Sequence, residues 1–358
     1  VLRKVISEVD TRDSEHFREL NLGMLPKSLS GQRDIQLRIQ LEDPRNRGQV
    51  IDALVQDLKV LGPAHRVSRT SRIAVAGPRF TYRKRPTTLL GVAYAPAGQP
   101  GGREGTTGAD WLHPAYFNPE IIRRDLDHLS RAGINALSIS YDHVAQASQL
   151  RFFAAEAQSR QLWLQLEVAG LDPLSPDWST AQALMEEAEI QSMLPVYALT
   201  LGHNANLGNE ETRRTLDPLW RNWLVEQYGS IENARNIFGK HLNTFQQEVT
   251  GPTDKELHED GPHRLAVAAY RRFIDDMISR EFGVIVRALR GAGYDQLTTA
   301  SIPFHKVKGL AVDAAAVGNH LDYITADIGS LYQSGNTIEE AGFVAAYARA
   351  ASNGKPVS

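Results

Sequence analysis

Four acidic or amide side chains stand at the ends of apolar, strand-like segments of this sequence, where alternation along each segment places them on one face. Carboxylates in such places can move protons, activate a water molecule or bind hydroxyl groups. In barrels of alternating strands and helices, active sites lie at the carboxyl ends of the strands. We therefore expect four side chains to converge on one rim: Asp142, Glu167, Asn204 and Asp327.

The alternation within each segment supports this placement. Asp142 ends a face whose other members, Ser138 and Ser140, are small and polar. Glu167 ends the corresponding face of the next segment, and a carboxylate on an inner face is costly unless it is paired or hydrated. In the segment that follows, the expected inward set is Val196, Ala198, Thr200, Gly202 and Asn204.

Each candidate has a structural alternative. Asp142 and Asp327 could equally cap the segments that follow them. Trp111 follows a glycine-rich loop, and its ring could stack on the apolar face of a sugar. His203 either turns away from the inward set or lies on the loop. The other candidate substrate-binding residues are Tyr94, His203 and Tyr332.

The elements that must position these residues fall into two parts. Residues 1–76 show period-two alternation, and a turn-rich break at 44–48 separates two apolar stretches, which predicts a β-hairpin in a β-sandwich-like accessory domain. Residues 77–358 alternate strand and helix, the pattern of parallel βαβ units. A doubly wound sheet and a (β/α)8 TIM-type barrel both fit. The absence of a Gly-x-Gly-x-x-Gly turn favours the barrel.

One connection in the second part is unusually long. A structureless loop over about 205–292 is not expected inside a compact barrel, so we predict a helical insertion over the barrel mouth, with a helix from about His263 to Arg290. The sequence opens on Val1 in mid-pattern and stops at Ser358 where a strand begins. We therefore expect that both ends are cut from a longer protein and that the barrel is incomplete.

Composition excludes several functions. Lys+Arg 39 against Asp+Glu 42 gives a net charge of -3, so no basic field is available to hold nucleic acid or an anionic membrane. No apolar run approaches the roughly 18 residues of a membrane span. With Cys 0, disulfides, thiolate nucleophiles and iron-sulfur clusters are excluded. No phosphate loop or metal-ligand spacing stands out, so we expect neither a cofactor nor a metal.

Several motifs in order resemble one enzyme clan. Leu90–Pro96 looks like the first strand of the retaining glycoside hydrolases with a (β/α)8 barrel, which include β-galactosidases, cellulases and mannanases. Asn118–Tyr141 is similar to their first helix and second strand. Trp220–Ile231 is similar to the helix after their fourth strand, and Asn353–Val357 to the approach to their seventh. The resemblance covers about 78–358.

The resemblance implies a catalytic pair that this sequence carries only in part. In the clan, a glutamate at the end of strand four is the acid/base and one at the end of strand seven the nucleophile, about 5 to 5.5 Å apart. Here Asn204 takes the first position, and an amide cannot deliver a proton; the second would fall beyond Ser358. Glu210 could be a displaced acid, although Asn209, Glu210 and Glu211 fit a helix cap better.

Three functions compete at this point. The first is a glycoside hydrolase acting on a β-linked glycan, with Asn204, Glu210 and Glu167 as the candidate catalytic residues. The second is a catalytically inactive carbohydrate-binding pseudoenzyme that uses the same barrel mouth. The third, a metabolic barrel enzyme of another class, lacks a supporting motif. An oligosaccharide or polysaccharide is the expected partner, and the resemblance to bacterial exported enzymes slightly favours an extracytoplasmic location.

Overall fold

A computed structural model describes residues 34–42, 45–46, 49–59, 71–96, 109–114, 116–202, 207–304, 310, 312–327 and 337–358. The chain divides into two compact units, Val1–His65 and Arg66–Ser358. In the first unit, β1 (Asp34–Glu42) pairs antiparallel with β2 (Val50–Lys59), and the register shifts between Leu41 and Glu42. The hairpin predicted on either side of the 44–48 break is confirmed.

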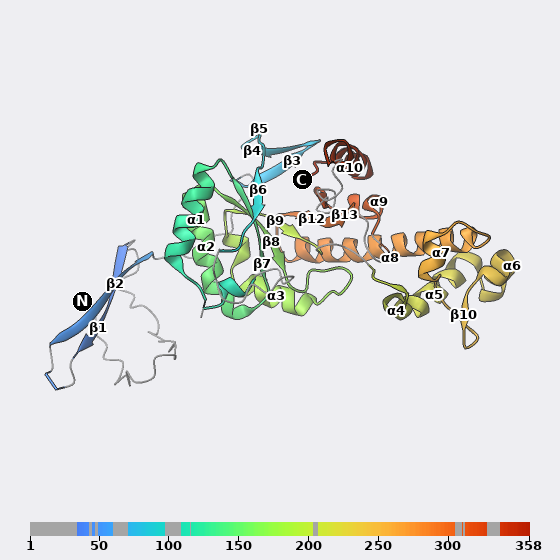
Figure 1. The fold of residues 1–358 in the computed structure, drawn as a ribbon, viewed down its shortest axis with the longest axis horizontal. Helices are drawn as coiled ribbons and strands as arrows, with labels where there is room; N and C mark the ends of the chain where they lie inside the picture. Colours follow the sequence, from blue (N-terminus) through green and yellow to red (C-terminus); the bar gives the residue numbers. More distant parts are fainter. Residues whose placement is uncertain are drawn as a thin grey trace. The chain divides into compact units, whose positions relative to one another are not determined.

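The second unit is built on a parallel sheet whose strands follow one another in space as they do in the chain (Figure 1). Five strands form its main part, in the order β12-β9-β8-β7-β6. Beyond β12, β13 pairs parallel with β14, and Ile324 makes a parallel bridge to Val357. The strands are β6 (Gly91–Ala93), β7 (Ala136–Tyr141), β8 (Trp163–Val168), β9 (Val196–Thr200), β12 (Leu297–Thr299), β13 (Ser301–Pro303) and β14 (Thr325–Asp327).

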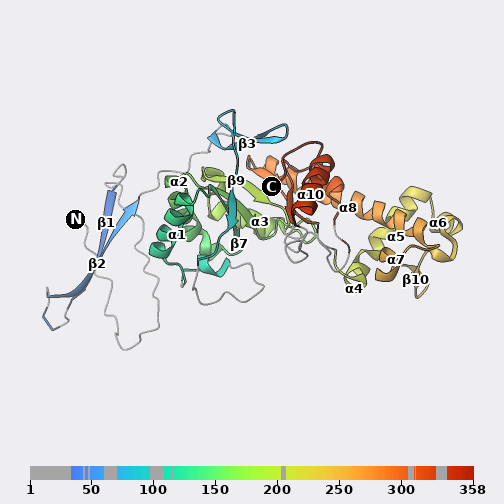
Figure 2. The same cartoon turned by 45° about the horizontal axis from the view of Figure 1, so that its top comes forward.

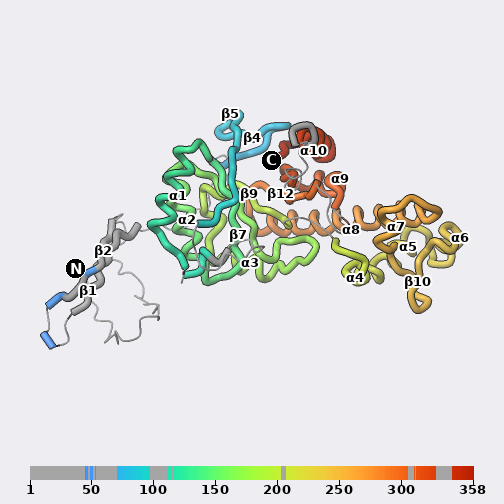
Figure 3. Tube along the Cα trace, viewed as in Figure 1, coloured from blue at the N-terminus to red at the C-terminus, as the bar shows by residue number. Residues whose placement is uncertain are grey.

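This order bears on the choice between the two predicted architectures. A doubly wound sheet reverses its strand order at a switch point, and no reversal occurs among the five described strands β6 to β12. Figure 3 traces the chain that runs through them. Among the described strands no pairing closes the sheet on itself. The described residues therefore form a mixed α/β fold with a parallel sheet wound in one sense.

Helices connect the strands and cover the outer face of the sheet. The first helix begins where the sequence predicts, because the Asn118 side chain accepts hydrogen bonds from the Glu120 and Ile121 amides, and Pro119 occupies the first turn. Its Ile122 and Leu126 are buried in the main core. The connecting helices are α1 (Pro119–Arg131), α2 (Ala147–Ser159), α3 (Trp178–Glu187), α9 (Ala314–Gly318) and α10 (Thr337–Ala351).

The connection between β9 and β12 is a helical excursion, as predicted, and α8 is the helix expected from about His263 to Arg290. Figure 2 shows α8 reaching from the sheet to the group of shorter helices. Trp220 and Trp223 of α5 are buried against Phe273 of α8. The excursion contains α4 (Glu210–Arg213), α5 (Asp217–Tyr228), α6 (Ile231–Phe238), β10 (Thr244–Phe245), β11 (Glu248–Val249), α7 (Asp254–His258) and α8 (Arg264–Gly291).

A small antiparallel sheet covers the amino end of the parallel strands. It consists of β3 (Ile73–Ala76), β4 (Arg79–Tyr82) and β5 (Arg85–Pro86). The Phe80 ring meets the Tyr323 ring edge-on at 5.0 Å, and the Tyr82 ring meets Trp163 at 5.1 Å. Because Trp163 is the first residue of β8 and Tyr323 precedes β14, these contacts seal the end of the inner face where the strands begin.

Candidate functional site

Polar side chains line up across the inner face of the sheet near the carboxyl ends of its strands. Ser140 of β7 is in register with Glu167 of β8, Glu167 with Thr200 of β9, and Thr200 with Thr299 of β12. The Ser140 hydroxyl donates to Glu167 Oε2 at 3.3 Å. One level of the sheet therefore carries three hydroxyls and a carboxylate side by side.

Hydrogen bonds extend this level toward the last strands. Thr299 Oγ1 lies 3.1 Å from Thr325 Oγ1, which lies 2.9 Å from Ser358 Oγ. Glu167 is the one ionisable member of the set, and its side chain is half-buried. We call this set the hydroxyl row: Ser140, Glu167, Thr200, Thr299, Thr325 and Ser358.

The composition of the inner face suits a polar ligand. The interior of a (β/α) barrel is ordinarily filled by bulky branched side chains. Here Ser138, Ala198 and the hydroxyl row take those places, so small and polar groups replace the apolar filling. Of the hydroxyl row, Ser140, Glu167 and Thr325 are half-buried, whereas Thr200 and Thr299 are buried.

Below the hydroxyl row, Gln165 joins three neighbours on the inner face. The Tyr323 hydroxyl donates to Gln165 Oε1 at 2.8 Å and the Tyr197 hydroxyl to the same oxygen at 3.2 Å. Gln165 Nε2 donates to Thr200 Oγ1 at 3.0 Å. Burial raises the pKa of both tyrosines above the usual value, so both remain protonated donors. Sequence reasoning missed this set because it weighed charged groups rather than neutral ones.

Tyr197 reaches the inner face through a β-bulge. Leu164 pairs with Val196, but the next residue, Gln165, pairs with Ala198, which leaves Tyr197 as the extra residue. Val196 belongs to the core under the helices, whereas Tyr197 belongs to the inner cluster. The prediction that Val196 faces inward is therefore wrong, and the bulge is the reason.

The predicted rim residues lie at one edge of the sheet wherever the structure describes them. Asp142 follows β7 directly and is exposed, and the adjacent cap is made by His143, whose Nδ1 accepts from the Ala145 amide. The alternative reading of Asp142 as that cap is wrong. Asp327 ends β14 and is half-buried. The predicted residues His203, Asn204 and Tyr332 lie outside the described residues.

Two aromatic candidates are part of the core. Trp111 is 4% exposed and Tyr94 is 8% exposed, and both rings contact Phe153 of α2. The Tyr94 hydroxyl also donates to Asp125 Oδ2 of α1 at 3.4 Å, and burial raises its pKa. Neither ring offers a free face, so the structure does not support the expected stacking of Trp111 on a sugar or ligand contact through the Tyr94 ring. The apolar indole ring of Trp111 is more stable in the core than in water. The glycine-rich sequence before Trp111 gives no sign of this burial.

Glu210 lies where a helix-capping segment would place it. The Asn209 side chain accepts from the Thr212 amide, and Glu210 pairs with Arg214 one turn later at 2.5 Å. The backbone before α4 is held to the segment after β13 by two hydrogen bonds: the Leu207 amide donates to the Leu310 carbonyl, and the Leu310 amide donates to the Gly208 carbonyl. An open hollow beside it is lined by Asn209, Glu210, Glu211, Arg214 and Asp254.

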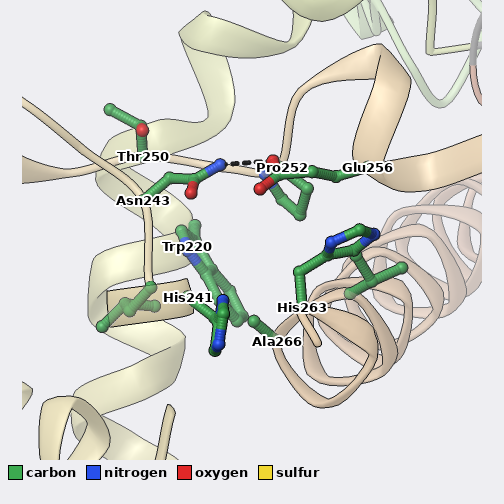
Figure 4. A pocket seen from close by; sticks show the side chains of 10 residues that line it. Trp220, His241, Asn243, Thr250, Pro252, Glu256, His263 and Ala266 are labelled. Atoms are coloured by element: carbon green, nitrogen blue, oxygen red, sulfur yellow. Dashed lines mark hydrogen bonds between the residues drawn. The ribbon is translucent and has the colours of Figure 1, made fainter. Parts of the chain in front are cut away.

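The helical excursion contains a separate cavity (Figure 4). Asn243 Nδ2 donates to Glu256 Oε2 at 2.6 Å on its wall, and Trp220 lines it from α5. The centre of a water molecule can occupy a volume of about 10 Å³ in this cavity, which is enough for about one water molecule. The cavity is thus too small for a sugar ring.

Neither a metal-binding cluster nor a membrane-spanning helix occurs among the described residues. They contain no group of three or more His, Cys, Asp or Glu side chains placed to hold a metal ion. Among the helices that the structure describes, none is both long and apolar enough to cross a lipid bilayer.

Comparison with known proteins gave similar solved structures only. No family model and no curated protein matches the chain. A β-galactosidase from the psychrophilic Marinomonas ef1 is 15% identical with a TM-score of 0.48, over 75% of this chain and 47% of the other. A β-galactosidase from the Antarctic haloarchaeon Halorubrum lacusprofundi is 15% identical with a TM-score of 0.43, over 67% and 40%.

An endo-1,4-β-mannanase from Rhizomucor miehei is 9% identical with a TM-score of 0.40, over 80% of each chain. The present chain spans less than half the length of the two β-galactosidases that it matches. These solved structures that resemble the chain are β-glycosidases.

Proposed function

We propose that this chain is a glycoside hydrolase-like protein that acts on or binds a β-linked glycan at the carboxyl end of its parallel sheet. The observation that carries the proposal is the hydroxyl row, in which Glu167 stands among hydroxyl side chains on an inner face. Sugar hydroxyls both donate and accept hydrogen bonds, as do serine and threonine, while a carboxylate only accepts. Ser140, Glu167 and Thr325 are half-buried and Thr200 and Thr299 are buried, so Glu167 and Ser140 are the members of the row that a polyhydroxylated ligand would meet first.

The proposed architecture is a (β/α)8 barrel with a helical insertion at about 205–292 and a β-rich accessory domain. The sequence predicts the accessory domain at 1–76, but the second unit begins at Arg66, so β3 belongs to the barrel part. The one-sense order of the parallel strands supports the barrel. The sheet at 73–86 supports it as well, because it seals the amino end of the inner face and leaves the carboxyl end as the way in. A ligand would therefore enter beside Asp142 and Asp327.

Within the proposal, catalysis depends on which acid is available. With Asn204 in the acid position, general acid catalysis worth about 10² to 10⁴-fold is absent. Substrates with activated aryl leaving groups need less protonation and would be cleaved faster than glycans, unless Glu210 supplies the acid. The second candidate, a binding protein without turnover, follows from the same Asn204.

The test combines turnover and binding on one set of variants. A panel of 4-nitrophenyl β-glycosides is assayed for release of nitrophenol, and cellobiose, lactose and mannobiose are titrated calorimetrically. Glu167→Gln should lower affinity about tenfold or more, the effect of losing a hydrogen bond to a charged group. Glu226→Gln, the same change on the exposed side of α5, serves as the control.

Each outcome decides between the candidates. Turnover that Glu167→Gln diminishes supports the hydrolase, and binding without turnover supports the pseudoenzyme. Failure of every glycan to bind, or equal effects of Glu167→Gln and Glu226→Gln, would refute a glycan site at the hydroxyl row.

A further inference from the structure

The orientation of the Gln165 amide is fixed by two buried phenols. Tyr323 and Tyr197 are 0% and 4% exposed, and a buried hydroxyl without an acceptor costs free energy. Gln165 Oε1 accepts from both. If the amide were turned over, its NH2 group would face both hydroxyls. The two hydroxyl oxygens lie 3.4 Å apart, so one phenol could donate to the other, but the second proton would lose the acceptor that Gln165 provides.

This orientation determines which way the Thr200 hydroxyl donates. With its oxygen facing the tyrosines, the Gln165 amide directs Nε2 at Thr200 Oγ1, 3.0 Å away. A hydroxyl has one proton and two acceptor sites. Because the Thr200 oxygen accepts from Gln165, the Thr200 proton points away from Gln165. The branched side chain of threonine has few rotamers, which limits the directions in which the hydroxyl can lie. Thr200, which is 4% exposed, thus keeps a proton to donate at the level of the hydroxyl row.

Glu167 provides the complementary group at the same level. It is in register with Thr200 on the neighbouring strand, about 4.8 Å away in the pairing direction. Its carboxylate already accepts from Ser140 and has further lone pairs to offer. One donor and one acceptor therefore stand next to each other on the inner face.

We propose that Thr200 and Glu167 together recognise a pair of neighbouring sugar hydroxyls, one accepting from Thr200 and the other donating to Glu167. Gln165, Tyr197 and Tyr323 act as positioning residues that hold the Thr200 proton toward the ligand. The inference rests on the proposed function and extends it, because it assigns the direction of each hydrogen bond.

The first test needs no ligand. The side-chain amide of Gln165 is observed by 15N-1H NMR and assigned by its loss in Gln165→Leu. We expect Thr200→Val to shift one amide proton and Tyr323→Phe to shift the resonance as a whole, with Thr244→Val on exposed β10 as the control. A Gln165 amide that does not respond to Thr200→Val would overturn the assigned orientation.

The second test measures affinity for cellobiose and lactose and for their monodeoxy analogues. Thr200→Val should weaken the parent sugar about tenfold while Thr200→Ser, which keeps the hydroxyl, should stay within about threefold. The analogue that lacks the accepting hydroxyl should bind Thr200→Val and the unmodified protein alike. A purely structural role would instead lower the affinity for every analogue equally.

The outcomes separate the two proposals. If the sugars bind and Glu167→Gln weakens them but Thr200→Val does not, the role of Thr200 is wrong and the glycan site stands. If no sugar binds, the proposed function fails and recognition of paired hydroxyls fails with it, while the NMR measurement still decides the Gln165 orientation.

Discussion

The two ends of the inner face are made differently although the same strands run through both. At the amino end, Trp163, Tyr197 and Tyr323 pack with the β3–β5 sheet into a closed aromatic cluster. At the carboxyl end, the hydroxyl row presents small polar groups and one carboxylate. Strand β8 passes from Trp163 to Glu167 within six residues. The comparison shows that one end contributes apolar burial to stability while the other end is polar.

Gln165 lies at the boundary between the two ends. Its oxygen faces the tyrosines of the closed end, and its nitrogen faces Thr200 of the open end. The aromatic cluster therefore has two effects, because it both excludes water and orients the polar groups above it. The predictions that follow test whether stability and ligand binding separate along this boundary.

The largest effect on stability is expected at the closed end. Ile73 is 2% exposed, so Ile73→Ala should lower the free energy of unfolding by about 2 to 5 kcal/mol. Ile237→Ala, at a position 55% exposed, should change it by less than about 0.5 kcal/mol. Urea unfolding measures both, and similar values for the two variants would show that β3 does not stabilise the inner face.

An effect of intermediate size on the free energy of unfolding, one that depends on pH, is expected at helix α8. Burial, and then the negative charge of Asp313, raises the pKa of Asp275 on α8 to about 6. Because the folded protein disfavours the ionised form, this group makes the free energy of unfolding fall as pH rises from about 4 to about 6. Asp275 is half-buried, and solvent screening reduces the effect.

Asp275→Asn should therefore raise the free energy of unfolding by up to about 1 kcal/mol near neutral pH and leave it unchanged near pH 4. Urea unfolding at several pH values provides the measurement, with Glu226→Gln as the exposed carboxylate control. A gain of equal size at every pH would point to packing rather than to ionisation.

At the open end, Glu167→Gln should change stability little. The side chain is half-buried and Ser140 can donate to an amide oxygen as it does to the carboxylate. We expect a change within about 1 kcal/mol in urea unfolding, together with the loss of affinity argued above. Destabilisation as large as that of Ile73→Ala would mean that Glu167 holds the fold together, and the division between the two ends would not hold.

The sequence was informative where a local pattern determines the element. The cap at Asn118, the hairpin in residues 34–59 and helix α8 all follow from spacing and turn chemistry. The position of Glu167 on the inner face was also predictable from the alternation of side chains along the strand, because β8 pairs regularly with β9 in its second half. These features depend on neighbours in the chain, which a sequence displays directly.

Features that depend on contacts between distant segments were not predictable. The bulge that turns Tyr197 inward shows only when β8 and β9 are paired. Gln165 gains its importance from Tyr323, 158 residues away. The sequence predicts Trp111 in a loop, but it lies in a short 3-10 helix at Ala109–Leu112, where Phe153 and Tyr94 complete an apolar site that buries it. In each case the deciding partner is far away in sequence.

The smallest effect on stability and on turnover is expected from a change at Glu210. This change tests whether the catalytic surface at the open end of the sheet extends to α4. As a first-turn acid paired with Arg214, Glu210 contributes about 0.3 to 0.5 kcal/mol to stability, whereas Asn209→Ala removes the cap and should cost about 1 kcal/mol. Glu210→Gln keeps the shape of the side chain and removes only the charge, so turnover of 4-nitrophenyl glycosides and of glycans should change less than twofold.

A displaced acid would behave differently in one respect. Glu210→Gln would then slow glycans, whose leaving groups need a proton, far more than aryl glycosides, whose leaving groups do not. The ratio of the two rates is therefore more diagnostic than either rate alone, and Asn209→Ala, which disturbs the same helix without removing the carboxylate, is the control. A ratio altered by Glu210→Gln and untouched by Asn209→Ala would assign the acid to α4, and the catalytic surface would then extend beyond the strand ends onto the helical excursion.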